Sequence, residues 1–197
     1  QYWKPVLSSP HFPYIDSRII NLKSSKLGVN GFSTRLNQVL NNIPESYILY
    51  LQDDMWLFPS VDSFYFKYSY FLLKHFEWNG VKIHSKYFYN YKLTPTNKFV
   101  KKKRLFKQTG DSEYLLSHQA TIWNKGFLLS IMSTNETPWD NEKNGTERIR
   151  KLEDPRIYHL NYQWYFQHNK SSPIENGKKK LLPAQEDLLH QLEYYDI

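Results

Sequence analysis

The stretch that decides the fold is Tyr47-Ile48-Leu49-Tyr50-Leu51-Gln52-Asp53-Asp54, where five apolar or aromatic residues run into a polar residue and two carboxylates. Such a run predicts a strand buried on both faces, as in the parallel sheets of α/β proteins. Adjacent carboxylates at the end of a buried strand repel each other and lose hydration, and a divalent cation relieves both effects. Ligands also bind outside the carboxyl ends of strands in open α/β sheets. Asp53 and Asp54 are therefore a candidate metal site.

Helices and strands alternate on both sides of this stretch, which predicts an α/β fold. Spacing and turn signals predict helices over 34–43, 61–78, 127–132 and 142–152, and strands near 15–22, 81–84, 114–116, 120–123 and 157–166. Ser33 is the predicted N-cap of the first helix, and Asp62 or Ser63 that of the second. Residues 92–112 are polar, basic and rich in turn formers, which predicts a mobile loop whose Lys101–Arg104 segment folds over a bound diphosphate.

Composition narrows the class of protein. The chain has 197 residues, which suits one domain, and it contains no cysteine, which excludes disulfides, thiolate metal sites and a cysteine nucleophile. Its formal net charge is +7, with basic runs at Lys101–Arg104 and Lys178–Lys180. Such runs favour anionic partners, although they also occur in solvated loops. The sequence has no apolar run of about 18 residues and begins at Gln1, so we expect a domain without a transmembrane helix and without its first strand.

Three segments occur in an order that resembles a known family. Gly31-Phe32-Ser33-Thr34-Arg35-Leu36-Asn37 opens a predicted helix, Tyr47–Asp54 is the strand with terminal carboxylates, and Trp123–Leu128 is followed by the acidic Trp139-Asp140-Asn141-Glu142. This order resembles the GT-A fold glycosyltransferases that use nucleotide sugars, most closely the small bacterial-type transferases of surface-polysaccharide assembly. The resemblance implies one GT-A-like domain over residues 1–197, with a Rossmann-like, mixed, mostly parallel sheet flanked by helices.

The resemblance also implies a reaction and its cofactor. A sugar moves from a nucleotide diphosphate to a hydroxyl of a glycan, and Mn²⁺ or Mg²⁺ neutralises the leaving diphosphate. Asp54 is the expected main ligand, with Asp53 as a second ligand. Glu142 or Asp140 is the expected base, which favours inversion, although either residue could instead cap the helix that follows.

Further residues are expected to bind the donor. Arg35, Asp53, Gln52, Trp139 and His118 are assigned to it: Arg35 for phosphate, Trp139 for stacking on a sugar, and Gln52 because it occupies the first position of the acidic motif. A surface ion pair for Arg35, core packing for Trp139 and a structural role for His118 are the alternatives.

The expected partners follow from the same resemblance. They are a UDP-, GDP- or dTDP-linked hexose or deoxyhexose and a glycan or lipid-linked glycan acceptor, with no nucleic acid. The expected location is the cytoplasm, with peripheral association at the inner face of a membrane. The competing hypotheses are a basic nucleic-acid-binding protein, a metal-dependent nuclease, and a structural module in which Asp53 and Asp54 only end a strand.

Overall fold

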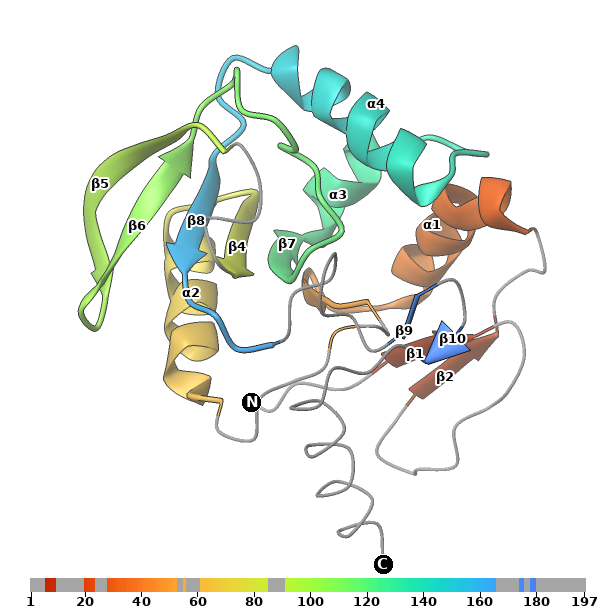
Figure 1. Ribbon diagram of the computed structural model, residues 1–197, viewed down its shortest axis with the longest axis horizontal. Coiled ribbons are helices and arrows are strands. Elements are labelled where there is room, and N and C mark those ends of the chain that lie inside the picture. Colours follow the sequence, from red (N-terminus) through yellow and green to blue (C-terminus); the bar gives the residue numbers. More distant parts are fainter. Residues whose placement is uncertain are drawn as a thin grey trace, which may run out of the picture.

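The computed structural model describes residues 6–9, 20–23, 28–52, 55, 61–84, 91–165, 174–175 and 178–179 (Figure 1). Its helices are η1 (Val29–Gly31), α1 (Phe32–Asn42), α2 (Ser63–His75), α3 (Lys125–Ile131) and α4 (Pro138–Arg150). Its strands are β1 (Val6–Ser9), β2 (Ile20–Lys23), β3 (Tyr47–Tyr50), β4 (Gly80–His84), β5 (Leu93–Val100), β6 (Lys103–Gln108), β7 (Thr121–Asn124), β8 (Ile157–Asn161), β9 (Ile174–Glu175) and β10 (Lys178–Lys179). The described part of the chain is therefore α/β, as predicted.

Six strands form one mixed sheet in the order β3-β7-β4-β8-β6-β5. Only β4 and β8 pair in parallel; the other neighbouring pairs are antiparallel. The prediction of a mostly parallel sheet is therefore wrong. The physical reason is that β7 inserts between β3 and β4, while β6 follows β5 through a short turn and must run against it. As a result β3, β4, β8 and β5 all point one way. The strands β1 and β2 pair in parallel, and β9 and β10 pair antiparallel.

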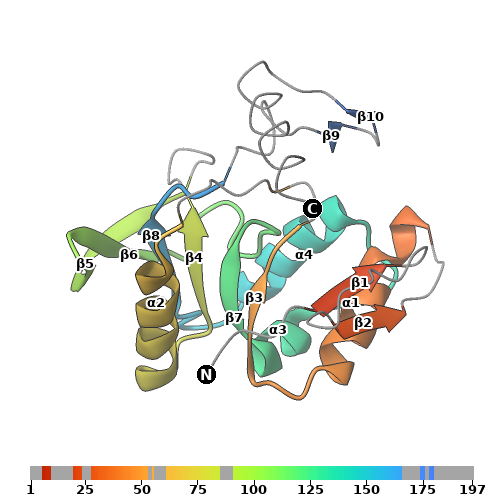
Figure 2. The same ribbon diagram turned by 90° about the horizontal axis from the view of Figure 1, so that it is seen from below.

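Helices cover both faces of the sheet, as Figure 2 shows. On one face α2 buries Phe66, Leu72 and Leu73 against Val81 and Ile83 of β4. On the other face, α1, α3 and α4 bury their apolar side chains against β3, β7 and β8; these side chains are Leu40, Leu128, Ile131 and Ile149. Gly80 is required at the start of β4, because a Cβ there would lie 2.6 Å from the ring of Trp123 on the neighbouring strand.

The apolar strand β3, which precedes Gln52, Asp53 and Asp54, is an edge strand of this sheet. Its residues Tyr47–Tyr50 are all partly exposed, and within the six-stranded sheet β3 pairs with β7 alone. The expectation that the strand is buried is therefore wrong as to extent, since its residues are only partly buried, although each of its faces contacts a core. Tyr47 and Leu49 face the core under α2, while Ile48 and Tyr50 face the core under α1, α3 and α4. An apolar run of this kind reflects a strand that contacts two cores, one on each face.

The loop predicted over 92–112 is mostly a β-hairpin. The strands β5 and β6 pair through Phe99 with Arg104 and Val100 with Lys103, and Lys101 takes a positive φ of 51° in the turn. The prediction failed because the hairpin lies at the opposite edge of the sheet, where β5 exposes half of its residues and needs few apolar ones. The expected lid segment Lys101–Arg104 is accordingly the turn of this hairpin and the start of β6.

The start of α1 is tied to the segment before α4. Ser33 lies inside α1, whose N-cap is Gly31, so the prediction of Ser33 as the cap is wrong. Its hydroxyl instead accepts a hydrogen bond from the backbone N–H of Glu136 at 2.9 Å, and its own N–H donates to the Glu136 carbonyl at 3.1 Å. The Glu136 carboxylate accepts hydrogen bonds from Arg148, Asn141 and Asn144. A buried polar network thus fixes α4 against α1.

The predicted cap Asp62 is confirmed, and Asn124, which was not predicted as a cap, has the same role in α3. Asp62 caps α2 by accepting a hydrogen bond from the N–H of Phe64 at 2.9 Å, and Asn124 caps α3 by accepting one from Phe127 at 3.0 Å. Within the described ranges, no helix is long and apolar enough to cross a membrane.

Candidate active site

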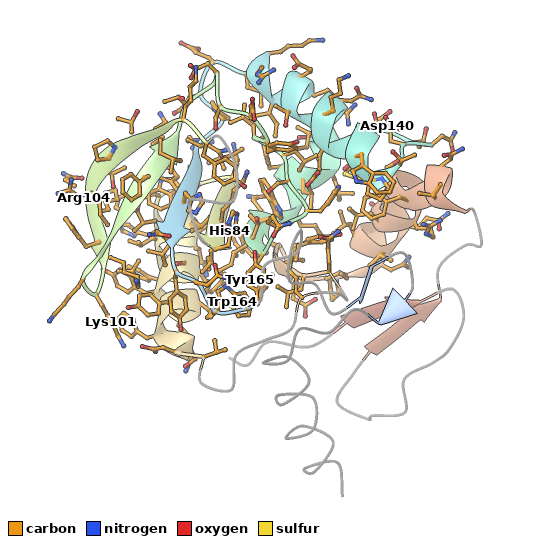
Figure 3. All side chains as sticks on the ribbon, viewed as in Figure 1. His84, Lys101, Arg104, Asp140, Trp164 and Tyr165 are labelled. Atoms are coloured by element: carbon orange, nitrogen blue, oxygen red, sulfur yellow. The ribbon has the colours of Figure 1, made fainter. Side chains whose placement is uncertain are left out.

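Polar residues gather where three strands of the sheet end. Because β3, β4 and β8 point the same way, their carboxyl ends lie side by side with the amino end of β7. We call this side of the sheet, where these strand ends meet, the functional edge. Gln52 follows β3, His84 and Asn161 end β4 and β8, and Gln119 precedes β7. Figure 3 shows His84 at this edge, with Trp164 and Tyr165 of the segment after β8 beside it. The Tyr165 hydroxyl donates to Oε1 of Gln119 at 2.8 Å, so this segment is fastened to the same edge.

A row of buried polar side chains crosses the sheet behind this edge. Thr121, Lys82 and His159 are direct neighbours on β7, β4 and β8, and all three are fully buried. Nε2 of His159 donates to the carbonyl oxygen of His84 at 2.9 Å, and the Tyr91 hydroxyl lies 3.3 Å from Nε2 of His84. The face under α1, α3 and α4 is therefore apolar toward one end of the strands and polar toward the functional edge.

Lys82 is the charged member of this row. Its ammonium donates to the backbone carbonyl of Tyr114 and lies 4.8 Å from the centre of the Tyr91 ring. Burial lowers the pKa of Lys82 to about 7, and the negative charge of Glu142 opposes part of that fall. A lysine of this kind is poised between its charged and neutral forms near neutral pH.

The segment before β7 covers the row of polar side chains and is held by α4. Residues 115–120 are buried, and the N–H of Leu116 donates to the hydroxyl of Thr146 at 3.2 Å. Gly145 of α4 has room only for a hydrogen, since a Cβ there would lie 2.2 Å from Leu116. The strand predicted over 114–116 is therefore wrong: the segment is a turn-rich cover whose apolar side chains pack under α4 instead of joining a sheet.

His118 is where the three segments of the resemblance meet. Its ring lies 4.7 Å from the ring of Phe32 at the start of α1 and 5.4 Å from the ring of Tyr50 at the end of β3. Its backbone N–H donates to Oε1 of Glu142 in α4 at 2.6 Å. Phe32 and Glu142, which are more than 100 positions apart in the chain, thus both contact His118, the first at its ring and the second at its backbone.

Glu142 is the acidic residue that faces this edge. Its carboxylate is partly exposed, is bonded to the His118 backbone and lies close enough to Lys82 to affect the pKa of that lysine. Asp140, two positions earlier, belongs to another side of α4. Its Oδ2 accepts a hydrogen bond from the Thr137 hydroxyl at 2.7 Å, and its N–H donates to Thr137 Oγ1 at 3.1 Å. The N-cap of α4 is Thr137, and Asp140 lies in the first turn, where its negative charge favours the helix N-terminus. Figure 3 shows Asp140 at the end of α4 nearest α1.

The remaining sequence-predicted residues, Trp139, Arg35 and Gln52, lie in three separate places. Trp139 is 71% exposed and precedes Glu142 by three positions, which places both on neighbouring parts of the α4 surface. Core packing of Trp139 is therefore excluded. Arg35 donates to the carbonyl oxygen of Gly28 at 2.5 Å, before α1. Gln52 is half-buried, and its carbonyl accepts a hydrogen bond from the N–H of Met55 at 3.2 Å.

The two predicted metal ligands, Asp53 and Asp54, lie outside the residues that the structure describes. Among the described residues, no group of three His, Asp or Glu side chains is arranged to hold a metal ion. The assignment of Asp53 and Asp54 as metal ligands therefore stays a prediction from sequence.

Lys82, His84 and His159 were missed by the sequence reasoning. Val81-Lys82-Ile83-His84 alternates in the manner of a strand with one solvated face, so nothing local indicates that Lys82 is buried. Its burial depends on the 112–120 segment, which comes about 30 residues later in the chain.

Comparison with models of known protein families finds no match, and a search of curated proteins finds no similar sequence.

The burial of His118 gives a prediction about stability and pH. Burial lowers the pKa of His118 to about 4 from an ordinary value of 6.5, and Asn141 opposes part of the fall. Between these two values the unfolded chain binds more protons, so stability rises with pH by about 3 kcal/mol from this group. We expect His118→Gln to reduce the difference in free energy of unfolding between pH 4.5 and 7 by about 2 kcal/mol, measured by urea titration. Equal differences in both proteins would contradict the assignment.

Proposed function

We propose that this chain is a metal-dependent glycosyltransferase with a GT-A fold, which moves a hexosyl or deoxyhexosyl group from a nucleotide diphosphate to a hydroxyl of a glycan. The observation that supports the proposal most strongly is the convergence on His118. Phe32, Tyr50 and Glu142 come from the three segments that resemble this family, and each contacts that residue. The mixed sheet with helices on both faces is compatible with the fold.

Glu142 is the proposed general base. A carboxylate held by a backbone N–H at the functional edge can take the proton of an acceptor hydroxyl as its oxygen attacks the anomeric carbon. The bond from that carbon to the diphosphate oxygen then breaks, and the nucleoside diphosphate leaves. Because base and leaving group are separate, this arrangement favours inversion. Trp139 offers an exposed ring near Glu142 on which an acceptor sugar can stack.

Asp54 and Asp53 are the residues proposed to hold Mn²⁺ or Mg²⁺ at the end of β3. Carboxylate oxygens suit either ion, and a bound ion would neutralise the diphosphate. The glycan or lipid-linked acceptor belongs to the same proposal. The donor side would include Gln52 and His118 at the edge, with Arg35 near the start of α1.

Thermal unfolding tests the proposed metal and nucleotide binding. With Mn²⁺ present, we expect one of UDP, GDP or dTDP to raise the melting temperature by about 5–10 °C at 100 times its dissociation constant. The shift should disappear without Mn²⁺ and in Asp54→Ala, because the diphosphate then lacks its bridging cation. Asp140→Asn is the matched control and should keep the shift. An undiminished shift in Asp54→Ala would contradict the metal assignment, and no shift with any nucleotide would contradict the proposed donor.

A further inference from the structure

The outer face of α2 carries an aromatic stripe, formed by the exposed Phe64, Phe71 and His75 with the partly buried Tyr68 between them, at spacings of four, three and four residues. Such spacing places all four on one side of the helix, opposite the buried Phe66, Ser69, Leu72 and Leu73. Phe64 is 41% exposed and Phe71 is 52% exposed, and Phe76 at the end of the helix is 38% exposed. A helix that only packs on a sheet needs no aromatic residues on its outer side, so this stripe requires another explanation.

Lysine side chains flank the stripe on both sides. Lys67 and Lys74 lie on the exposed surface of α2 itself. From the β5–β6 hairpin, the Lys98 ammonium lies 3.7 Å from the ring centre of Phe76, and that of Lys101 lies 5.0 Å from that of Phe64. Figure 3 shows Lys101 at the tip of the hairpin, beside the amino end of α2. The stripe is therefore aromatic along its centre and basic along its borders.

Few negative charges offset these lysines. Asp62 and Glu77, at the two ends of α2, are the carboxylates that this helix region contributes. The Asp62 carboxylate already forms an ion pair with the Lys101 ammonium, which also donates a hydrogen bond to it. The surface therefore favours a partner that is both anionic and able to receive aromatic side chains.

We propose that the α2 aromatic stripe and the hairpin tip dock on an anionic lipid bilayer surface. Aromatic side chains settle at the level of the lipid headgroups, and lysines at the borders attract anionic lipids. The ring geometry favours lipid over nucleic acid, which needs open ring faces on which bases can stack. Here Phe64 stacks on Tyr68 with planes 9° apart, and Phe71 stacks on His75 with planes 10° apart. Lys101 also lies over the ring of Phe64, and Phe76 has Lys98 over its ring and stacks on Trp78, so these rings offer little open face to a base.

Vesicle sedimentation of the full chain tests this surface. We expect the chain to sediment with vesicles of phosphatidylcholine and phosphatidylglycerol at three to one, and to stay in solution with phosphatidylcholine alone. The double variant Phe64→Ala/Phe71→Ala should lower the partition coefficient by about tenfold or more, because the inserted rings are lost. Lys98→Gln/Lys101→Gln should lower it as well and should weaken its dependence on salt.

Phe99→Ala is the matched control. Phe99 is 45% exposed and carries Arg104 at 5.1 Å from its ring centre, yet its neighbour Val100 points into the core under α2, so Phe99 faces the other side of the sheet. Loss of vesicle binding in Phe99→Ala equal to that in the double variant would overturn the proposal, as would equal binding to neutral vesicles. Tight binding of a single-stranded oligonucleotide that needs Phe64 and Phe71 would instead assign the stripe to nucleic acid. A dimer of the wild-type chain that does not form in the double variant would assign it to a second copy of the chain. The outcome is independent of sugar transfer, because Glu142 is not involved.

Discussion

Glu142→Gln is expected to lower the turnover of sugar transfer by about 10²–10⁴-fold, the usual contribution of a positioned base. Glutamine keeps an oxygen that can accept the hydrogen bond from the N–H of His118, so the cover segment and the fold should be retained. It cannot take a proton from the acceptor hydroxyl. Turnover is measured as nucleoside diphosphate released from the nucleotide sugar that the wild-type chain consumes fastest. The melting shift with nucleotide and Mn²⁺ should be unchanged, because donor binding does not require the base.

Asp140→Asn is the control for this experiment, since Asp140 is the other acidic residue assigned to the base. Its carboxylate is exposed and bonded to Thr137 at the start of α4, and asparagine can still accept that hydrogen bond. We expect its turnover to stay within about twofold of wild type. Normal turnover in Glu142→Gln, or an equally large loss in Asp140→Asn, would show that Glu142 is not the base.

Arg148→Met is expected to lower the free energy of unfolding by about 3–5 kcal/mol. Arg148 donates two parallel hydrogen bonds of 2.9 Å to the carboxylate of Glu136, which is only 9% exposed. Burial alone raises the pKa of Glu136, but hydrogen bonds from Arg148, Asn141 and Asn144 outweigh it and leave the pKa below its ordinary value. Without the guanidinium, a buried carboxylate loses its main partner. Urea unfolding at pH 7 measures the loss.

Lys92→Met provides a matched comparison, because Lys92 pairs with Asp111 at 2.9 Å while both side chains are mostly exposed. Solvent screens such a pair, so its loss should cost less than about 1 kcal/mol. Similar losses in the two variants would show that the Glu136 network does not hold α4 against α1.

Local signals were sufficient for several helices and inner strands. The cap Asp62 located the start of α2, the spacing of apolar residues located α3, and a short alternating run and a short apolar run located β4 and β7. Strand direction was not available from these signals. Alternation of helices and strands favours parallel pairing, but it cannot show that β7 inserts antiparallel between β3 and β4. The β5–β6 hairpin was missed because the edge strand β5 exposes half of its residues, so it needs few apolar ones and has the composition of a loop.

The candidate site likewise combines residues that were predicted from sequence with residues that only the structure brings together. Family resemblance brought Glu142 and His118 forward, and the structure places them 2.6 Å apart through the His118 backbone. The buried row of Thr121, Lys82 and His159 depends on the register of three strands from distant parts of the chain. No local pattern encodes that register, so a buried lysine with a pKa of about 7 could only be found in the structure.

The most direct test of the proposed activity is donor consumption by the full chain. The chain is incubated with Mn²⁺, simple alkyl and aryl glycosides as acceptors, and one donor at a time from a panel of UDP-, GDP- and dTDP-linked sugars. The masses of the products are measured by mass spectrometry. We expect one donor to give a glycoside heavier by one hexosyl or deoxyhexosyl unit, with an equal amount of nucleoside diphosphate, and no product after EDTA. A chain that binds Mn²⁺ and nucleotide but consumes no donor, or that consumes donors equally in EDTA, would contradict a metal-dependent glycosyltransferase.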